Sequence, residues 1–270
     1  GSQEIAIAAA LSGDQAMIDA YTSGDPYMAF AKQAGLVPPV ATKETHKAVR
    51  NRCKAIVLGV GYGMGAKSMA DRAGLSVAEA RELLRRHHET YRTFWRWAED
   101  NVNTVLAGGT LPTVFGWPIR YGPRTKPNTR SLLNFPMQAN GAEMLRLAAC
   151  MATEAGLKVC APIHDALLVE APLGRLDEDV FQLKAIMVKA SKMVMQSLAC
   201  RVDAEIVRHP DRYRDESGSE MWDRVMGLID TVEAGGAGGT WWDISVPTVG
   251  HIWDTRSNIF SILIYGLLRG

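Results

Sequence analysis

Cysteine is scarce in this sequence, and the few cysteines form no recognisable pattern. None of the four belongs to a Cys-x-x-Cys pair, and all lie far apart or in unrelated segments: Cys53, Cys150, Cys160 and Cys200. This scatter indicates neither a disulfide framework nor a zinc site. Reduced thiols, and therefore a cytoplasmic location, are expected.

Long apolar runs and a charge excess of one sign are also missing. The longest apolar run, residues 259–268, is too short to span a bilayer, and no secretory signal opens the chain. We therefore predict no membrane association. The formal net charge of +1 excludes a uniformly basic, histone-like protein. With 47% hydrophobic residues, the 270-residue chain can bury the core of one large domain or of two smaller ones.

An initiator methionine is missing as well. The chain opens at Gly1 and runs directly into an apolar alternation that is typical of the middle of a structural element. This start predicts an N-terminally truncated piece of a larger protein.

The first hundred residues are expected to be mostly helical. Residues 4–11 read as a strand entering a helix, and the following helices should break at residues 23–26, Ser-Gly-Asp-Pro. A helix is expected from Thr42 or Thr45 to about Gly63. Helical periodicity then continues to about residue 107, with Ser76 as an N-cap.

The second half mixes helices with short strands. Two apolar runs separated only by His164 and Asp165 predict a tight β-hairpin. The other expectations are short β pieces over 110–122, a helix over 130–156, a helix over 173–198, a half-buried strand over 201–208, a linker over 235–239 and a Trp-rich tail without usable periodicity.

A glycine turn offers one functional reading of residues 50–67. Gly61, Gly63 and Ala66 fit the Gly-x-Gly-x-x-Gly/Ala fingerprint of dinucleotide-binding folds, which would suggest a nicotinamide-dependent oxidoreductase. That fold needs a second strand ending in an acidic residue about 20 positions on, but Glu79 and Glu82 fall inside a helix. The context therefore disfavours a dinucleotide site.

A helical reading of the same stretch is more informative. Arg50, Lys54, Leu58 and Tyr62 are spaced four apart, so each is rotated by only about 40° and the row spans about 18 Å. Two cations, an apolar side chain and an aromatic match, in order, a triphosphate, a sugar with its base, and a neighbouring base. The alternative is a solvated basic helix end with Leu58 in the core.

Two further sets of polar residues also allow either a functional or a purely structural role. At the hairpin tip, Asp165 projects toward solvent and could bind a divalent cation, or it could serve only the turn. Arg130, Asn134 and Gln138 lie four apart on one face of a helix, which faces either water or a ligand.

The pattern from Arg50 to Gly63, Arg-x-x-x-Lys-x-x-x-Leu-Gly-x-x-Tyr-Gly, resembles the fingers-helix motif of family A DNA polymerases, the bacterial DNA polymerase I type. The resemblance implies that Arg50 and Lys54 hold the phosphates of the incoming dNTP. It also implies that Leu58, where the family more often has Phe or Tyr, lies against the sugar and base, and that Tyr62 lies near the templating base.

Other segments resemble the palm of the same family. The His164-Asp165 pair resembles its His-Asp-Glu motif, with Ala166 in place of Glu, which implies that Asp165 binds the catalytic Mg²⁺ pair and that His164 lies near the primer end. Arg130, Asn134 and Gln138 match positions that contact primer and template. The segment 110–122 resembles the family's Thr-x-x-Gly-Arg-Arg region, with Trp-Pro in place of arginines.

The start of the chain resembles the stretch just after the family's first metal-binding aspartate. Glu4 falls on the sugar-selecting Glu, so that aspartate would lie about two positions before Gly1, outside this chain. Asp165 alone would hold two metal ions poorly.

The resemblance implies an α+β fold of the right-hand type, with an antiparallel palm sheet and a helical fingers insertion. It divides the chain into the start of the palm (1–34), fingers (35–105), the rest of the palm (106–230) and a tail of unknown role (231–270). The implied activity is template-directed DNA synthesis in replication or repair, by a cytoplasmic monomer that acts on primer-template DNA and dNTPs with Asp165, Lys54 and His164 as catalytic residues. The alternative is a catalytically inactive DNA-binding remnant.

Overall fold

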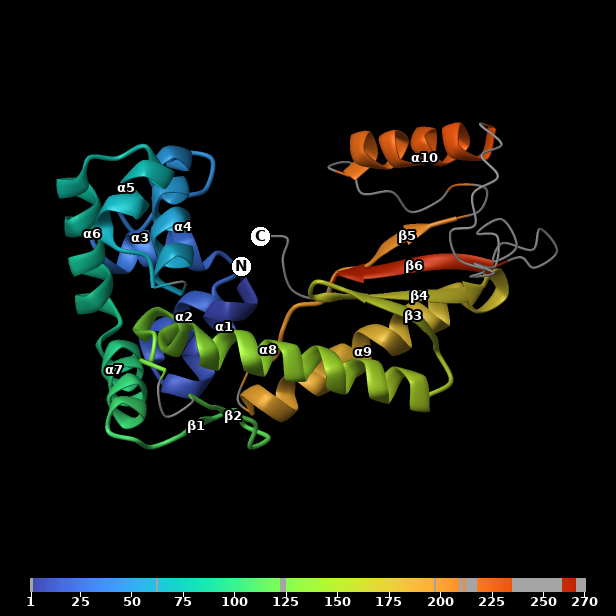
Figure 1. Ribbon diagram of the computed structural model, residues 1–270. Coiled ribbons are helices and arrows are strands. Elements are labelled where there is room, and N and C mark those ends of the chain that lie inside the picture. Colours follow the sequence, from blue (N-terminus) through green and yellow to red (C-terminus); the bar gives the residue numbers. More distant parts are fainter. Residues whose placement is uncertain are drawn as a thin grey trace.

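The molecule consists of a helical lobe and an antiparallel sheet that packs on two long helices (Figure 1). The computed structural model describes residues 2–61, 63–121, 125–196, 198–208, 211, 218–234 and 259–265. This combination confirms the predicted α+β class.

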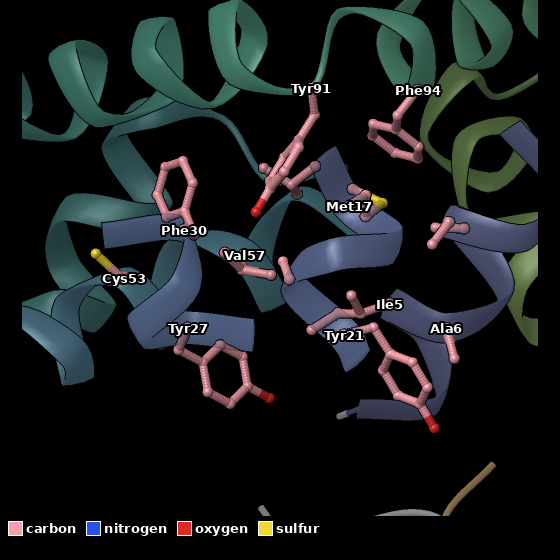
Figure 2. Packing of buried hydrophobic residues seen from close by; sticks show 14 of the residues in the cluster. Ile5, Ala6, Met17, Tyr21, Tyr27, Phe30, Cys53, Val57, Tyr91 and Phe94 are labelled. Carbon is pink, nitrogen blue, oxygen red and sulfur yellow. The ribbon is translucent and has the colours of Figure 1, made fainter. Parts of the chain in front are cut away.

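Helices of the first lobe follow one another with short connections. They are α1 (Ser2–Ser12), α2 (Gln15–Thr22), α3 (Pro26–Gln33), α4 (Lys47–Gly61), α5 (Ala66–Ala73), α6 (Val77–Thr90) and α7 (Arg92–Leu106). Their apolar faces share one core, and Figure 2 shows side chains from several of these helices meeting in it, among them Ile5, Met17, Phe30, Val57, Tyr91 and Phe94.

Residues 4–11 were predicted as a strand entering a helix. The strand part is wrong and the helix part is confirmed, because α1 is helical from Ser2 to Ser12. Residues 5–9 are all at least 94% buried, so apolar side chains surround the helix instead of marking one face. A helix that is buried on all sides has no polar face, so an apolar alternation in its sequence does not indicate a strand. Its alanines favour the helical backbone.

The predicted helix break at residues 23–26 is confirmed. Gly24 adopts φ +98°, Asp25 caps α3 by accepting a hydrogen bond from the Met28 N–H at 3.1 Å, and Pro26 occupies the first turn. The predicted N-cap Ser76 is also confirmed, because it forms a complete capping box with Glu79 at the start of α6.

Helix α4 begins later than expected. Thr45 Oγ1 accepts a hydrogen bond from the Thr42 N–H at 2.9 Å, so these two residues stabilise a turn before the helix. The helix itself starts at Lys47, and Thr42 and Thr45 are not its caps.

The sheet contains β3 (Lys158–Ile163), β4 (Ala166–Pro172), β5 (Glu205–Val207) and β6 (Ile259–Tyr265) in the order β3-β4-β6-β5, with every neighbouring pair antiparallel. Ile163 pairs with Ala166, which leaves His164 and Asp165 as the two-residue turn. The predicted hairpin is therefore confirmed, with His164 at φ +55°.

Two strand expectations in this sheet need correction. The strand predicted over 201–208 is limited to β5, and β6 comes from the tail, in which no element was predicted. The predicted linker 235–239 lies outside the described residues. β6 pairs along the whole of β4, with Ala166 opposite Tyr265.

Helix α8 (Thr129–Glu154) extends from the helical lobe to the sheet and packs on α9 (Leu176–Met195), as Figure 1 shows. The small β1–β2 hairpin (Leu111–Pro112 and Pro118–Ile119) precedes α8, and α10 (Ser219–Ala234) follows β5. None of the helices in the described part of the chain is long and apolar enough to cross a membrane.

Candidate functional site

The basic end of α4 carries the two predicted phosphate-binding residues, Arg50 and Lys54. Residues four apart share one face of a helix, so these cations and Leu58 form a row along α4. Arg50 is only 8% exposed, and its Nε donates a hydrogen bond to Asp25 Oδ2 within an ion pair. A guanidinium buried to this extent needs such a partner. Tyr62, the fourth residue of the row, lies outside the described residues.

Tyr27 of α3 presents its ring to both cations. The centroid lies 5.3 Å from Arg50 Cζ and 5.6 Å from Lys54 Nζ, which are cation–π distances. Burial raises the pKa of Tyr27 to about 12, although the charge of Arg50 acts to lower it. The phenol is therefore neutral at physiological pH.

A small cavity beside Leu58 brings residues of several helices together. Its volume is about 30 Å³, which is room for one or two water molecules. It is lined by Glu4, Ile5, Ala8, Met17, Val57, Leu58, Val60, Gly61, His87, Phe94 and Met137. Glu4 Oε1 also accepts a hydrogen bond from Gln138 Nε2 at 2.7 Å. The fold thus groups three predicted site residues that are far apart in sequence: Glu4, Leu58 and Gln138.

His87 contributes a buried polar group to this cavity. It is 1% exposed, and its Nδ1 accepts a hydrogen bond from Trp95 Nε1 at 3.0 Å. The ring proton of neutral His87 therefore sits on Nε2, which has no hydrogen-bond partner among the described residues. Burial lowers the pKa of His87 to about 3, and the neighbouring His88 acts in the same direction.

The predicted polar row on α8 begins next to the end of α4. A Cβ built on Gly63 would lie 3.3 Å from Arg130 Cα, so the turn after α4 packs directly on the first turn of α8. Asn134 is half-buried and Gln138 is exposed, one and two helical steps further along. Arg130, Asn134 and Gln138 therefore follow α8 from the end of α4 toward α1, whereas their contacts with DNA stay predictions.

The β3–β4 turn presents an unusual carboxylate. The side chain of His164 is 79% exposed and that of Asp165 only 12%, with Nδ1 and Oδ1 3.3 Å apart. Asp165 Oδ2 is buried and has no hydrogen-bond partner within the described chain. Burial raises the pKa of Asp165, against the lowering effect of its hydrogen bond with His164. An unpaired buried carboxylate oxygen is a group that a cation would stabilise.

The described residues supply only one part of a metal site. Oxygen is the ligand that Mg²⁺ prefers, so Asp165 fits as a single ligand. Ala166, where the resembled motif has Glu, is buried and offers no donor. In the ranges that the structure describes, no three His, Cys, Asp or Glu side chains gather closely enough to hold an ion.

Sequence reasoning missed three residues of this site: Asp25, Tyr27 and His87. Asp25 belonged to the predicted helix break and Tyr27 followed it, and their contacts with α4 arise only from the packing of α3 on α4. The adjacent histidines 87 and 88, in an aromatic-rich helical segment, were the only local signal for His87.

Known proteins with a similar sequence or fold are DNA polymerases. The family described as DNA polymerase family A matches residues 1–209, and the chain belongs to that family. It is similar to the POL domain of Pol1 from M. smegmatis, solved in complex with DNA primer-template and dNTP. Sequence identity is 28%, the TM-score is 0.59, and the match covers 69% of this chain and 35% of that one.

Curated relatives carry related names. DNA polymerase I, thermostable, of Thermus thermophilus is 28% identical over 200 residues, covering 69% of this chain and 24% of that protein. DNA polymerase I of Aquifex aeolicus is 29% identical, covering 75% and 37%. The DNA polymerase of Mycobacterium phage D29 is 25% identical, covering 70% and 30%. The chain thus spans 24% to 37% of the length of these relatives.

Proposed function

We propose that the chain carries the fingers and most of the palm of a DNA polymerase that copies a template in replication or repair. The reaction is attack of a primer 3′-hydroxyl on the α-phosphate of a dNTP. The observation that carries the proposal is the row on α4, in which Arg50 and Lys54 contact the Tyr27 ring and Leu58, one helical turn after Lys54, lines the cavity. Its length suits a nucleotide, and its charge suits a triphosphate.

The α4 row would bind the nucleotide. Arg50 and Lys54 neutralise phosphate charge as it develops during transfer, which is the main contribution a protein makes to phosphoryl chemistry. Leu58 and Glu4 face the sugar and base, and Tyr62 stacks near the templating base. The proximity of Glu4 and Leu58 at one cavity supports this assignment.

The primer-template would lie along α8 and the hairpin tip. Arg130, Asn134 and Gln138 contact the duplex from its minor-groove side, where shape can be checked without reading sequence. His164, exposed at the tip, lies near the primer end. Most of the affinity would come from phosphate contacts, so DNA binding should weaken as salt rises.

Asp165 is the proposed metal ligand of the chain. A pair of Mg²⁺ ions, when bound, would stabilise the attacking and leaving oxygens. The unpaired Asp165 Oδ2 supports the assignment of one ligand. A second carboxylate is proposed about two positions before Gly1. The chain is further proposed to be a cytoplasmic monomer, with residues 1–34 and 106–230 as palm and 35–105 as fingers.

Primer extension tests this function. A labelled primer on a short template is incubated with Mg²⁺ and four dNTPs, using this chain and a version extended upstream with an Asp two residues before Gly1. Asp165→Ala in both versions removes the metal ligand, and Asp100→Ala, an exposed acid on α7, is the matched control.

Template-directed copying by the extended chain, abolished by Asp165→Ala and kept by Asp100→Ala, is the expected result. DNA binding without copying in every version would instead support the second candidate, a non-catalytic DNA-binding remnant. Among the residues that the structure describes, no three His, Cys, Asp or Glu side chains gather to hold an ion, and position 166 is an alanine. Both observations favour that candidate.

A further inference from the structure

Two cations on α4 share one aromatic ring. Tyr27 lies near the start of α3, is 1% exposed, and sits at the lower edge of the core cluster in Figure 2. Its ring centroid is 5.3 Å from Arg50 Cζ and 5.6 Å from Lys54 Nζ. Because the ring is packed on nearly all sides, it cannot follow the two flexible side chains, and they must adapt to it.

The electrostatics of this contact favour a fixed pair of cations. An aromatic face carries negative partial charge, so the ring attracts both side chains although the two repel each other. Asp25 adds a full negative charge at Arg50 Nε. The same carboxylate caps α3, so Arg50 is tied to the helix that holds the ring.

A contact with a fixed ring can reduce the conformational freedom that a lysine side chain loses when it binds a phosphate. Its ammonium is a point charge on a stem of four carbons, and freezing that stem opposes binding. A ring that already restricts the stem reduces the freedom lost when a phosphate arrives. Arg50 is held by Asp25 and by the ring, and the ring contact restricts Lys54 as well.

We infer that Tyr27 is a positioning residue, whose ring holds Lys54 and Arg50 in place for the triphosphate of an incoming nucleotide. The inference rests on the proposed function of the α4 row. Tyr27 acts through the two cations and touches neither sugar nor base, so it governs phosphate affinity without affecting base selection.

Titration of a dNTP onto the chain bound to a fluorescently labelled primer-template tests the inference. Tyr27→Phe keeps the ring and is the conservative control, whereas Tyr27→Leu removes it. Tyr27→Met also lacks the ring but fills more of its space than Leu does, and it replaces the Leu variant if that variant does not fold. Lys54→Ala reports whether the row binds the nucleotide at all. Thermal unfolding and DNA affinity are measured for each variant.

Loss of the ring should weaken dNTP binding by about 3-fold to 10-fold, the factor expected from a cation–π contact in a partly desolvated site. Tyr27→Phe should stay within about 2-fold of wild type. Inorganic tripolyphosphate, used as a competitor, should lose affinity by the same factor as the dNTP. DNA affinity should not change.

The outcomes separate the inference from the function on which it rests. If Lys54→Ala weakens dNTP binding while Tyr27→Leu or Tyr27→Met leaves it unchanged, Tyr27 is not a positioning residue and the proposed function survives. An equal loss in Tyr27→Phe would also overturn the inference. If the wild-type chain binds no dNTP, or if Lys54→Ala has no effect, both fail together.

Discussion

His87 should make the stability of the helical lobe strongly dependent on pH. Burial lowers its pKa from 6.5 to about 3, so the native protein keeps the imidazole neutral while the unfolded chain takes up a proton below about pH 6.5. The unfolded state therefore binds more protons between these two values, and stability is lost as the pH falls. From about pH 7.5 to about pH 5, the loss from this group alone is about 2 kcal/mol.

His87→Phe removes the titrating group and keeps an aromatic ring among its neighbours. Phe30 and Tyr91 lie 5.2 and 4.8 Å from the His87 ring centroid, so a phenyl ring continues the same packing. Urea unfolding, followed by tryptophan fluorescence at each pH, gives the free energy of unfolding. Other groups titrate equally in both proteins, so the difference between them reports His87.

The variant should therefore lose about 2 kcal/mol less than wild type between these two pH values. Val40→Ala, which changes an exposed side chain that does not titrate, is the control and should show the pH dependence of wild type. If wild type and His87→Phe lose stability equally, the imidazole is not held neutral in the core and the account of this cavity is wrong.

Three other substitutions test separate parts of the structure. Asp14→Ala should lower the free energy of unfolding, measured in urea, by about 2 to 4 kcal/mol. The Asp14 carboxylate accepts hydrogen bonds from N–H groups in the first turns of α2 and α7, at 3.1 and 3.0 Å. Asp14→Asn should cost about half as much, and an Ala variant as stable as wild type would contradict these contacts. Gly63→Ala should cost about 1 to 2 kcal/mol, since φ is +61° and the new Cβ meets Arg130, whereas Gly61→Ala, which meets nothing, should cost nothing measurable. Asp165→Asn should raise the thermal midpoint, because burial raises the pKa of this acid and its ionised form therefore destabilises the fold above that pKa; a lower midpoint would refute this expectation.

Local chemistry in the sequence was enough to predict one helix break, one helix cap and one tight turn. The α2–α3 break follows from Gly24, Asp25 and Pro26, each of which favours the end or start of a helix through its own backbone preferences. The same holds for the Ser76 cap and for the turn at His164 and Asp165. These features depend on a few neighbouring residues, so no knowledge of packing was needed.

Features set by tertiary packing could not be predicted in this way. Helix α1 looked like a strand because burial on all sides hides the helical period. β6 joins the sheet through pairing with β4, almost a hundred residues earlier, which no local pattern reveals. The resemblance singled out Arg50 and Lys54 as predicted phosphate-binding residues, but their contacts with the Tyr27 ring depend on how α3 lies against α4.

The basic face of α4 is proposed to bind the triphosphate of a nucleotide. The most direct measurement compares Lys54→Ala with Lys189→Ala, an exposed lysine on α9, for dNTP affinity in the presence of primer-template and for affinity to DNA alone. Because Lys54→Ala loses one charge-assisted phosphate contact, its affinity for dNTP should fall by about 10-fold or more. Its affinity for DNA should stay close to that of Lys189→Ala and wild type. An equal loss of dNTP and DNA binding in Lys54→Ala would contradict the claim.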